Sequence, residues 1–261
     1  MLTGKGIHMK ADYKNWVPTG MIYGFGAAAA GLAIAAGIVK NKPISALLGA
    51  GALGCGAWTA WCVYANGQFS YDGNRQLSRQ IVEGTAEYIT MPEGGVGLDV
   101  GCDSGALTIA CAKKNPQGRM VGIDRWGAEY ASFNKELCEK NAEAEGINNV
   151  SFRKGDACKL DFPDETFDAV TSNYVYHNIT GKNKQALLRE TLRVLKKGGT
   201  FAIHDLMESA RYGDMEQFTA ELKAEGYEDV QLIKTTNGMF MSPGEAKLML
   251  LSGSTLLFGR K

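Results

Sequence analysis

The chain has 261 residues, enough for one ordinary domain and an added segment. It carries 28 basic and 28 acidic residues, and this zero formal charge argues against a nucleic-acid partner and against acidic substrates. Its six cysteines form no Cys-x-x-Cys pair and no Cys/His cluster with zinc spacing, so the sequence predicts free thiols and no metal site. A thiolate that handles a soft substrate such as arsenite is the alternative.

The N-terminal quarter is apolar. Residues Val17–Val39 and Pro43–Ala65 contain no charged side chain, and each run exceeds the roughly 20 residues that a helix needs to cross a bilayer. Only Lys40-Asn41-Lys42 separates the two runs, which favours a tight antiparallel hairpin. Aromatic side chains that suit a membrane interface lie near the ends: Trp16, Trp58, Trp61 and Tyr64. The sequence therefore predicts two membrane spans within residues 17–65.

Small residues recur four positions apart in both runs, a spacing that lets helix backbones approach closely in lipid. The pairs are Gly20/Gly24, Ala27/Gly31, Ala33/Gly37, Ala50/Gly54 and Ala52/Gly56. The same hairpin could also join copies of the chain into a homo-oligomer. Two alternatives stay open: a helical hairpin of a soluble protein, and a secretory signal with Lys5, Lys10 and Lys14 as its basic region. A signal would leave the second apolar run unexplained.

From Gln76 onward, helical and strand patterns alternate. Helices are predicted over Gln76–Tyr88, Ala106–Lys114, Glu129–Glu145 and Lys184–Leu195. Strands are predicted over Val96–Val100, Met120–Ile123, Val150–Arg153, Phe167–Ser172, Thr200–His204 and Thr255–Gly259. A turn at Lys196–Gly199 is expected between the last helix and the fifth strand. This alternation predicts a parallel sheet with right-handed crossovers.

A glycine-rich turn joins the first strand to its helix, with the sequence Leu98-Asp99-Val100-Gly101-Cys102-Asp103-Ser104-Gly105. Such a turn lets a ligand approach the backbone, and the helix N-terminus offers unpaired N–H groups. The spacing is not that of the dinucleotide fingerprint, because Asp103 and Ala106 stand where its second and third glycines would be. Asp99 lies two residues before the first glycine, where a carboxylate can pair with an ammonium group. Methionine derivatives carry that group and dinucleotides lack it.

Acidic residues also end the next two strands. Asp124 lies about 20 residues beyond the glycine turn, where a carboxylate can accept both hydroxyls of a ribose. Gly155-Asp156-Ala157 follows the third strand, at the sheet edge where an adenine ring would lie. One such acid alone is more often simply solvated, but three at successive strand ends predict a common ligand site.

Three segments carry a family resemblance. Asp99–Gly105 resembles the first motif of class I S-adenosylmethionine-dependent methyltransferases, Asp/Glu-x-Gly-x-Gly-x-Gly. Gly155–Asp168 and Glu190–Gly199 resemble the adenine loop, fourth strand and following helix of the subgroup related to ubiquinone and menaquinone methyltransferases (type 11). The resemblance covers about Tyr71–Lys261 and excludes the apolar hairpin.

The resemblance implies an α/β, Rossmann-like fold with a seven-stranded, mostly parallel sheet and a closing antiparallel hairpin. The two apolar runs predict an α-helical transmembrane hairpin before this fold. We accordingly divide the chain into an anchor at residues 1–66 and a methyltransferase domain at residues 67–261.

The implied cofactor is S-adenosylmethionine. By the resemblance, Asp99, Gly101 and Gly105 surround its methionine part, Asp124 binds the ribose, and Asp156 and the backbone of Ala157 bind the adenine. The remaining predicted cofactor residues are Cys102, Asp103, Arg125, Trp126, Asn173 and Tyr71, the last as part of a lid with Phe69. Trp126 either stacks on the adenine or packs in the protein.

One residue departs from the family's first motif. Asp103 replaces its middle glycine. Aspartate tolerates a positive φ better than most residues, so we expect cofactor binding to persist.

Methyl transfer from a sulfonium requires mainly that the protein position the reactants and exclude water. Ser172–Asn178 leaves the fourth strand at the carboxyl edge of the sheet, where ligands bind in such folds. His177 is the predicted catalytic residue, as a general base or as a group that orients the acceptor. His204-Asp205 is the second candidate.

The sequence thus predicts a membrane-tethered methyltransferase for a small apolar acceptor with an O, S, N or C nucleophile. Examples are a quinone precursor, a lipid or a hydrophobic thiol, entering past Tyr174, Tyr176 and His177. Because the cofactor is made in the cytosol, the domain is expected on the cytoplasmic side of the cell membrane. The alternative is a non-catalytic membrane sensor or scaffold that binds the cofactor without turnover.

Overall fold

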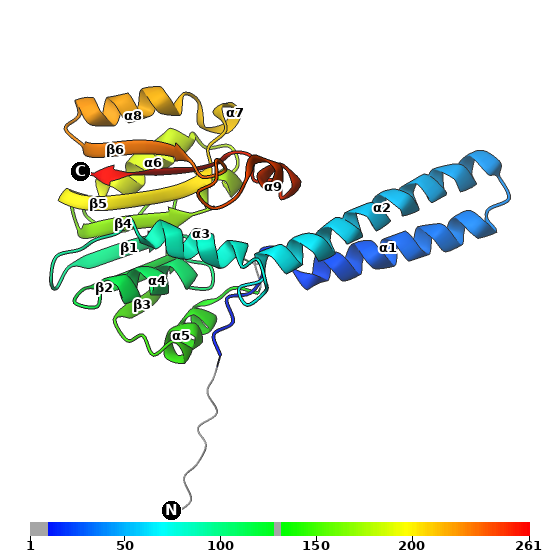
Figure 1. Ribbon diagram of the computed structural model, residues 1–261, viewed down its shortest axis with the longest axis horizontal. Coiled ribbons are helices and arrows are strands. Elements are labelled where there is room, and N and C mark those ends of the chain that lie inside the picture. The colour runs from blue at the N-terminus through cyan, green and yellow to red at the C-terminus, as the bar shows by residue number, and fades with distance from the viewer. Residues whose placement is uncertain (1–9, 128–131) are drawn as a thin grey trace, which may run out of the picture. The chain divides into compact units, whose positions relative to one another are not determined.

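The computed structural model describes residues 10–127 and 132–261 (Figure 1). These residues divide into two compact units. Lys14–Arg79 forms one, and residues 10–13 together with Gln80–Lys261 form the other. Lys5 and residues 129–131 lie outside the described residues. The helix expected over Glu129–Glu145 begins only at Lys135, because the side chain of Asn134 caps it by accepting the N–H of Leu137 at 2.8 Å.

The first unit is a hairpin of two long helices, α1 (Thr19–Ile38) and α2 (Lys42–Phe69). Asn41 caps α2, because its side-chain oxygen accepts the N–H of Ile44 at 3.3 Å. Pro43 lies in the first turn, where its missing N–H costs nothing. The short polar loop expected between the two apolar runs is therefore a helix cap.

Two asparagines close the open end of the hairpin. Asn15 Nδ2 donates to the carbonyl of Asn66 at 2.8 Å, and Asn66 Nδ2 donates to the carbonyl of Val17 at 2.7 Å. The rings of Trp16 and Phe69 pack beside them with centroids 5.1 Å apart. The chain therefore enters and leaves the hairpin at neighbouring points.

Between α1 and α2, the close approach predicted from the four-residue repeat does not occur at Gly24, Gly31 or Gly54. A side chain at Gly24, Gly31 or Gly54 would meet no described atom within 4 Å, so these glycines face away from the partner helix. Gly26 and Gly51 face it instead, and their Cβ positions lie 3.7 Å from Thr59 and 3.4 Å from Leu32. The stripe of helix contacts simply lies on another face of both helices.

Large apolar side chains cover the outside of the hairpin. Those most exposed include Tyr23, Ile34, Ile38, Leu47, Leu53 and Val63, with Leu53 78% exposed. By length and composition, both helices could cross a membrane. Lipid around this surface would remove it from water.

The second unit contains a seven-stranded sheet of order β3-β2-β1-β4-β5-β7-β6, within the described residues. The strands are β1 (Val96–Val100), β2 (Arg119–Asp124), β3 (Val150–Lys154), β4 (Phe167–Asn173), β5 (Leu195–Leu206), β6 (Glu228–Lys234) and β7 (Ser254–Arg260). Strands β1 to β5 pair in parallel, and β7 is antiparallel to β5 and β6. The predicted fold class is confirmed.

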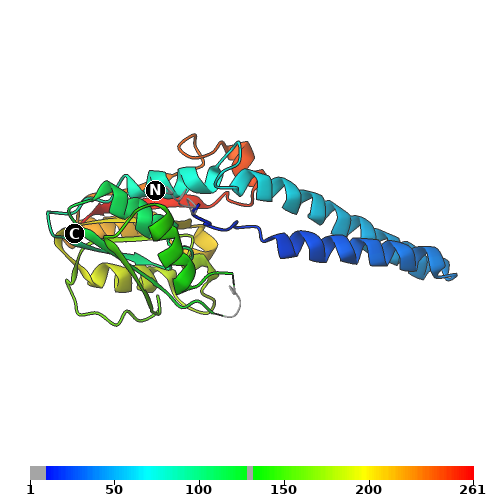
Figure 2. The same ribbon diagram turned by 90° about the horizontal axis from the view of Figure 1, so that it is seen from below.

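Helices cover both faces of the sheet (Figures 1 and 2). The helical elements after the hairpin are α3 (Leu77–Ala86), α4 (Ala106–Lys114), α5 (Lys135–Ala144), the 3₁₀ turn η2 (Tyr176–Asn178), α6 (Lys184–Arg193), α7 (Ser209–Tyr212), α8 (Met215–Ala224) and α9 (Pro243–Leu248). Successive strands run outward from β1 in one direction and from β4 in the other. A crevice forms beyond the carboxyl ends of strands at such a switch point. The topology therefore brings the turns after β1, β2, β3 and β4 to one edge.

The fifth strand differs most from its prediction. It begins at Leu195 rather than Thr200, so the expected Lys196–Gly199 turn is an irregular part of the strand. Gly198 has φ 78°, and its N–H donates to the carbonyl of Lys261 at 2.5 Å. Pairing with the chain end keeps these polar residues in the sheet.

Candidate cofactor site

The glycine-rich turn after β1 has a left-handed backbone at three positions, with φ 76° at Gly101, 46° at Asp103 and 83° at Gly105. Gly101 is required by contact as well, because a Cβ there would lie 2.3 Å from Val175 Cγ2. Asp103 occupies a conformation that costs a residue with a side chain about 1–2 kcal/mol. The position that the motif fills with glycine therefore does need a positive φ.

The carboxylate of Asp124 holds this turn. Its Oδ2 accepts the N–H of Asp103 at 3.1 Å, and its Oδ1 accepts the N–H of Trp126 at 2.6 Å. The indole N–H of Trp126 donates to the carbonyl of Asp103 at 3.0 Å, which favours the packing role for this tryptophan. A carboxylate has about four acceptor positions, so Asp124 keeps capacity for two ribose hydroxyls.

Left-handed non-glycine residues occur in the turns after three of the strands that meet here. Asp103 follows β1, Trp126 follows β2 with φ 44°, and Tyr174 follows β4 with φ 54°. Such conformations cost free energy and persist where the surrounding structure imposes them, often at ligand sites.

Three carboxyl groups gather behind and along the turn. Burial raises the pKa of Asp99 to about 7; a hydrogen bond from Thr108 at 2.6 Å opposes this rise, and the charge of Asp124 adds to it. Burial, with the charges of Asp124 and Asp99, raises the pKa of Asp103 to about 8. The other oxygen of Asp99, Oδ1, is buried with no hydrogen-bond partner among the described residues. An ammonium group fits this acceptor, and a cationic ligand would lower the repulsion within the cluster.

A cavity of about 430 Å³ opens at this edge, within the usual range for small-molecule pockets. Of the predicted cofactor residues, Gly101, Asp103, Asp124, Arg125, Asp156 and Ala157 line it. The segment after β4 also lines it, with Tyr174, Val175, Asn178, Ile179, Thr180 and Lys182. The sequence analysis had placed Ser172–Asn178 at the ligand edge, but it did not anticipate Ile179, Thr180 and Lys182, whose only signal was their position after a strand end.

The other predicted residues lie elsewhere in the part of the chain that the structure describes. Asp99, Cys102 and Gly105 are buried in or behind the turn. The side-chain oxygen of Asn173 forms a hydrogen bond with His204 Nδ1 at 2.9 Å. Tyr71 belongs to the hairpin unit, so its role in a lid remains a prediction.

His177 has a buried partner. Its Nδ1 lies 2.5 Å from Asp205 Oδ1, and its side chain is 15% exposed. Asp205 Oδ2 also accepts the backbone N–H groups of Tyr176 at 2.8 Å and His177 at 3.3 Å. Burial favours a higher pKa for Asp205, but the hydrogen bond and charge interaction with His177 hold that pKa below its usual value. An ionised Asp205 fixes the imidazole with its proton on Nδ1.

Two other residues that the sequence placed at the acceptor site, His204 and Tyr176, have structural contacts instead. His204 is fully buried, its ring nitrogens lie 2.9 Å from Asn173 Oδ1 and 2.9 Å from Thr235 Oγ1, and burial lowers its pKa to about 3. Neither nitrogen is free to act as a base. Tyr176 is also fully buried, with its hydroxyl 2.5 Å from Thr191 Oγ1 of α6, so it does not border an entrance for the acceptor.

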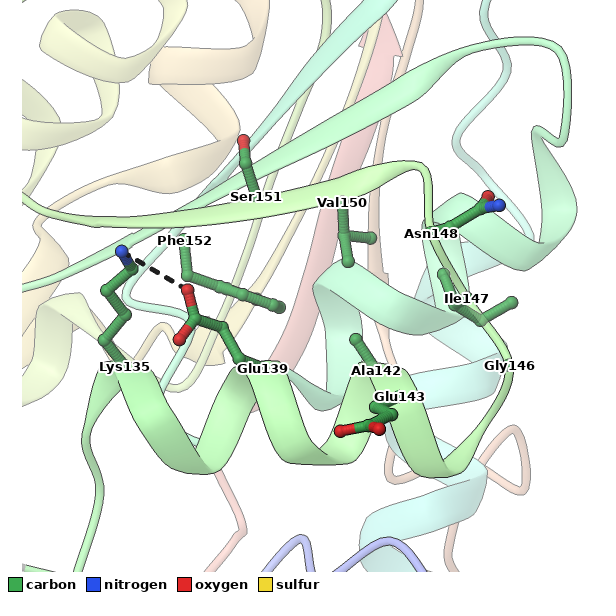
Figure 3. A pocket seen from close by; sticks show the side chains of 10 residues that line it. All are labelled: Lys135, Glu139, Ala142, Glu143, Gly146, Ile147, Asn148, Val150, Ser151 and Phe152. Atoms are coloured by element: carbon green, nitrogen blue, oxygen red, sulfur yellow. Dashed lines mark ion pairs between the residues drawn. The ribbon is translucent and has the colours of Figure 1, made fainter.

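A second hollow lies away from this site, along α5 and the edge strand β3 (Figure 3). Lys135 and Glu139 form an ion pair of 3.3 Å at its rim, and Val150 and Phe152 line its floor. It contains none of the predicted site residues and is an open surface groove.

Comparison with known proteins agrees with this fold. Residues 93–246 match the family described as a methyltransferase domain. An uncharacterised methyltransferase of Schizosaccharomyces pombe is 38% identical over 39% of this chain and 36% of its own length. A demethylmenaquinone methyltransferase of Lactobacillus johnsonii is 28% identical over 60% of this chain and 66% of its own. The chain thus spans about a third to two thirds of the length of these curated relatives.

Solved structures show the same fold. The crystal structure of the [4+2]-cyclase SpnF is 22% identical, with a TM-score of 0.53 over 72% of this chain and 82% of that one. Other structures of this fold contain S-adenosylhomocysteine or sinefungin. The fold and the family identify S-adenosylmethionine as the cofactor. The chain, with its glycine turn and acidic strand ends in the expected places, belongs to the methyltransferase domain family.

Proposed function

We propose that this protein is a membrane-anchored, S-adenosylmethionine-dependent methyltransferase that acts on a small apolar acceptor. The observation that carries the proposal is the cavity at the carboxyl edge of the sheet. The turns that the family uses for its cofactor and the segment after β4 both line this cavity. The bound cofactor supplies an activated methyl group on a sulfonium.

The chain's own residues bind the cofactor and orient it. In this proposal Asp99 accepts the ammonium group of the cofactor and Asp124 accepts the ribose hydroxyls. Asp156 and the backbone of Ala157 bind the adenine. Since an in-line displacement on carbon needs little further chemistry, holding the reactants together and excluding water supplies most of the acceleration.

The acceptor is expected at the wall formed after β4. Val175 and Ile179 offer apolar surface, while Asn178, Thr180 and Lys182 offer a few polar contacts. That mixture is typical of small-molecule pockets. A quinone precursor fits it, and one relative is named for a quinone substrate.

The hairpin supports the membrane part of the proposal. Its exposed surface is apolar, and both helices are long enough to cross a bilayer. An anchored enzyme meets an acceptor that partitions into lipid at high local concentration. We place the catalytic unit on the cytoplasmic side of the cell membrane, and we keep a homo-oligomer through the hairpin as part of the proposal.

A non-catalytic cofactor-binding protein is the second candidate, and the position of His177 favours it. This residue does not line the cavity among the described residues, and its Nδ1 is committed to Asp205. The fold alone does not decide between the two, because it also hosts a protein named as a cyclase.

Binding and turnover separate the candidates. The purified protein should bind S-adenosylmethionine in calorimetry and should transfer a labelled methyl group to a member of a panel of quinols, phenols, thiols and lipids. Binding without transfer to any of these classes would support the sensor or scaffold. Absence of binding would refute both.

A further inference from the structure

Asn141 of α5 connects two segments that are far apart in the sequence. Its side chain is buried, with the residue only 1% exposed. Its Oδ1 accepts the backbone N–H of Asp12 at 2.7 Å, and its Nδ2 donates to the carbonyls of Asp12 at 3.1 Å and Ser104 at 2.9 Å. The amide thus uses its acceptor and both donor hydrogens. One end of this contact is the glycine-rich turn, and the other is the segment that precedes the hairpin.

The same face of α5 makes two more contacts, because residues three or four positions apart lie side by side on a helix. Cys138 Sγ donates to the carbonyl of Asp103 at 3.2 Å. Glu145, at the helix end, accepts the hydroxyl of Tyr13 at 3.2 Å, and Tyr13 is 8% exposed. Residues 10–13, here called the strap, are therefore fixed to the helix face that also holds Asp103 and Ser104.

We propose that Asn141 is a positioning residue for the cofactor, and that the strap is the part of the structure that keeps Asn141 in place. Without Asp12, Asn141 Oδ1 loses the N–H that it accepts, and Asn141 Nδ2 loses one of the two carbonyls to which it donates. The amide can then turn away from Ser104, and the glycine turn samples conformations that do not bind the cofactor. The apparent affinity for the cofactor then falls in proportion to the fraction of the protein whose glycine turn keeps the binding conformation.

This inference rests on the proposed function, since it concerns affinity for S-adenosylmethionine. It goes beyond that function because it gives a binding role to residues upstream of the anchor. In the sequence the strap ends at Tyr13, and the hairpin unit begins at Lys14.

A backbone substitution tests the strap without altering Asn141. Asp12→Pro removes the N–H that Asn141 Oδ1 accepts, and Asp12→Ala keeps it and controls for the lost side chain. In the full-length protein in detergent, calorimetry should show S-adenosylmethionine bound about 3–10-fold more weakly by Asp12→Pro, the loss expected for one net hydrogen bond. Asp12→Ala should bind within about twofold of the wild type.

Hydrogen exchange gives a readout that does not depend on ligand. In ligand-free Asp12→Pro, the amides of residues 103–105 should exchange faster, while those of β5 keep their protection. Asn141→Ala should show the same pattern with a larger loss of affinity, and Asn148→Ala, an exposed asparagine just beyond α5, should match the wild type. Binding is measured below the melting transition of each variant.

The outcomes separate the two proposals. If the wild type binds the cofactor and Asp12→Pro binds it equally, with unchanged exchange at residues 103–105, the strap inference is wrong and the proposed function stands. If the wild type does not bind, the proposed function fails, and faster exchange of the turn in Asp12→Pro would still support the mechanical link.

Discussion

At the scale of single residues, Asp124 makes structural contacts that the sequence alone did not reveal. It was expected to bind ribose, and it also braces the glycine turn through Asp103 and the turn after β2 through Trp126. We predict that Asp124→Ala weakens S-adenosylmethionine binding at least tenfold, about 1.4 kcal/mol, since hydrogen bonds to a charged group contribute about 1.5–3 kcal/mol. Calorimetry measures this, with Glu139→Ala on the outer face of α5 as the control. Wild-type affinity in Asp124→Ala would overturn the ribose assignment.

Asp103 gives the pH-dependent prediction. Its pKa rises from 3.8 to about 8 in the folded protein, so folding disfavours its ionised form. The resulting loss of stability is absent below about pH 4, grows as the pH rises, and is complete above about pH 8. Asp103→Gly removes this penalty together with the left-handed strain at φ 46°.

We therefore expect ligand-free Asp103→Gly to melt at a higher temperature than the wild type. The difference should be larger at pH 8.5 than at pH 5, and scanning calorimetry at the two values measures it. The variant should bind the cofactor at least as well as the parent. A large loss of affinity would instead make Asp103 a contact residue.

At the scale of elements, the turn after β4 depends on one buried carboxylate. Asp205 of β5 accepts the backbone N–H groups of Tyr176 and His177 and the imidazole of His177. This segment also forms the proposed acceptor wall. Asp205→Asn and His177→Ala should therefore both lower turnover and leave cofactor affinity within about twofold, because the cofactor wall comes from other turns.

The double variant distinguishes positioning from direct catalysis. If both residues act by holding one turn, the double variant should be no slower than the slower single variant. Additive losses in turnover would assign His177 a separate catalytic role. Parent values of kcat and KM in His177→Ala would make the residue purely structural and place the acceptor pocket elsewhere.

The elements themselves were predictable where burial is uniform. Strands β1, β2 and β4 are largely apolar and buried, and the bounds of β1 to β4 agree with the prediction to within about two residues, although only Phe152 of the edge strand β3 is buried. The helices and strands of the C-terminal third were harder to predict. Helix α8 buries Phe218 and Leu222 on one side, but the segment lacks a motif, and the edge strand β6 shows only partial burial.

The residues of the candidate site were also predictable only in part. Residues at strand ends were predictable, since the carboxyl ends of parallel strands share an edge, and six of them line the cavity. The contacts of Asn141 with Ser104 and of His177 with Asp205 join residues 37 and 28 positions apart. Tertiary packing creates such pairs, and no local pattern marks them.

At the scale of the whole molecule, the hairpin should be separable from the catalytic unit. Asn15, Val17 and Asn66 meet at the open end of the hairpin, so a short linker can replace the helices between them. We predict that exchanging Pro18–Ala65 for a short Gly/Ser linker gives a protein that stays in solution without detergent. Its affinity for S-adenosylmethionine should lie within about twofold of the full-length value, because the linker keeps the strap and all cavity residues. Calorimetry and sedimentation measure the two properties.

A simple truncation that starts at Ser70 is the informative contrast. It removes the same apolar surface but also deletes Asp12 and Tyr13, so it should be soluble and yet bind the cofactor more weakly than the linker variant. Equal affinities would show that the strap is dispensable. If instead the full-length protein remains in the supernatant after membranes are pelleted, the transmembrane proposal fails. The exposed apolar face of α1 and α2 would then require another cover, such as a second copy of the chain.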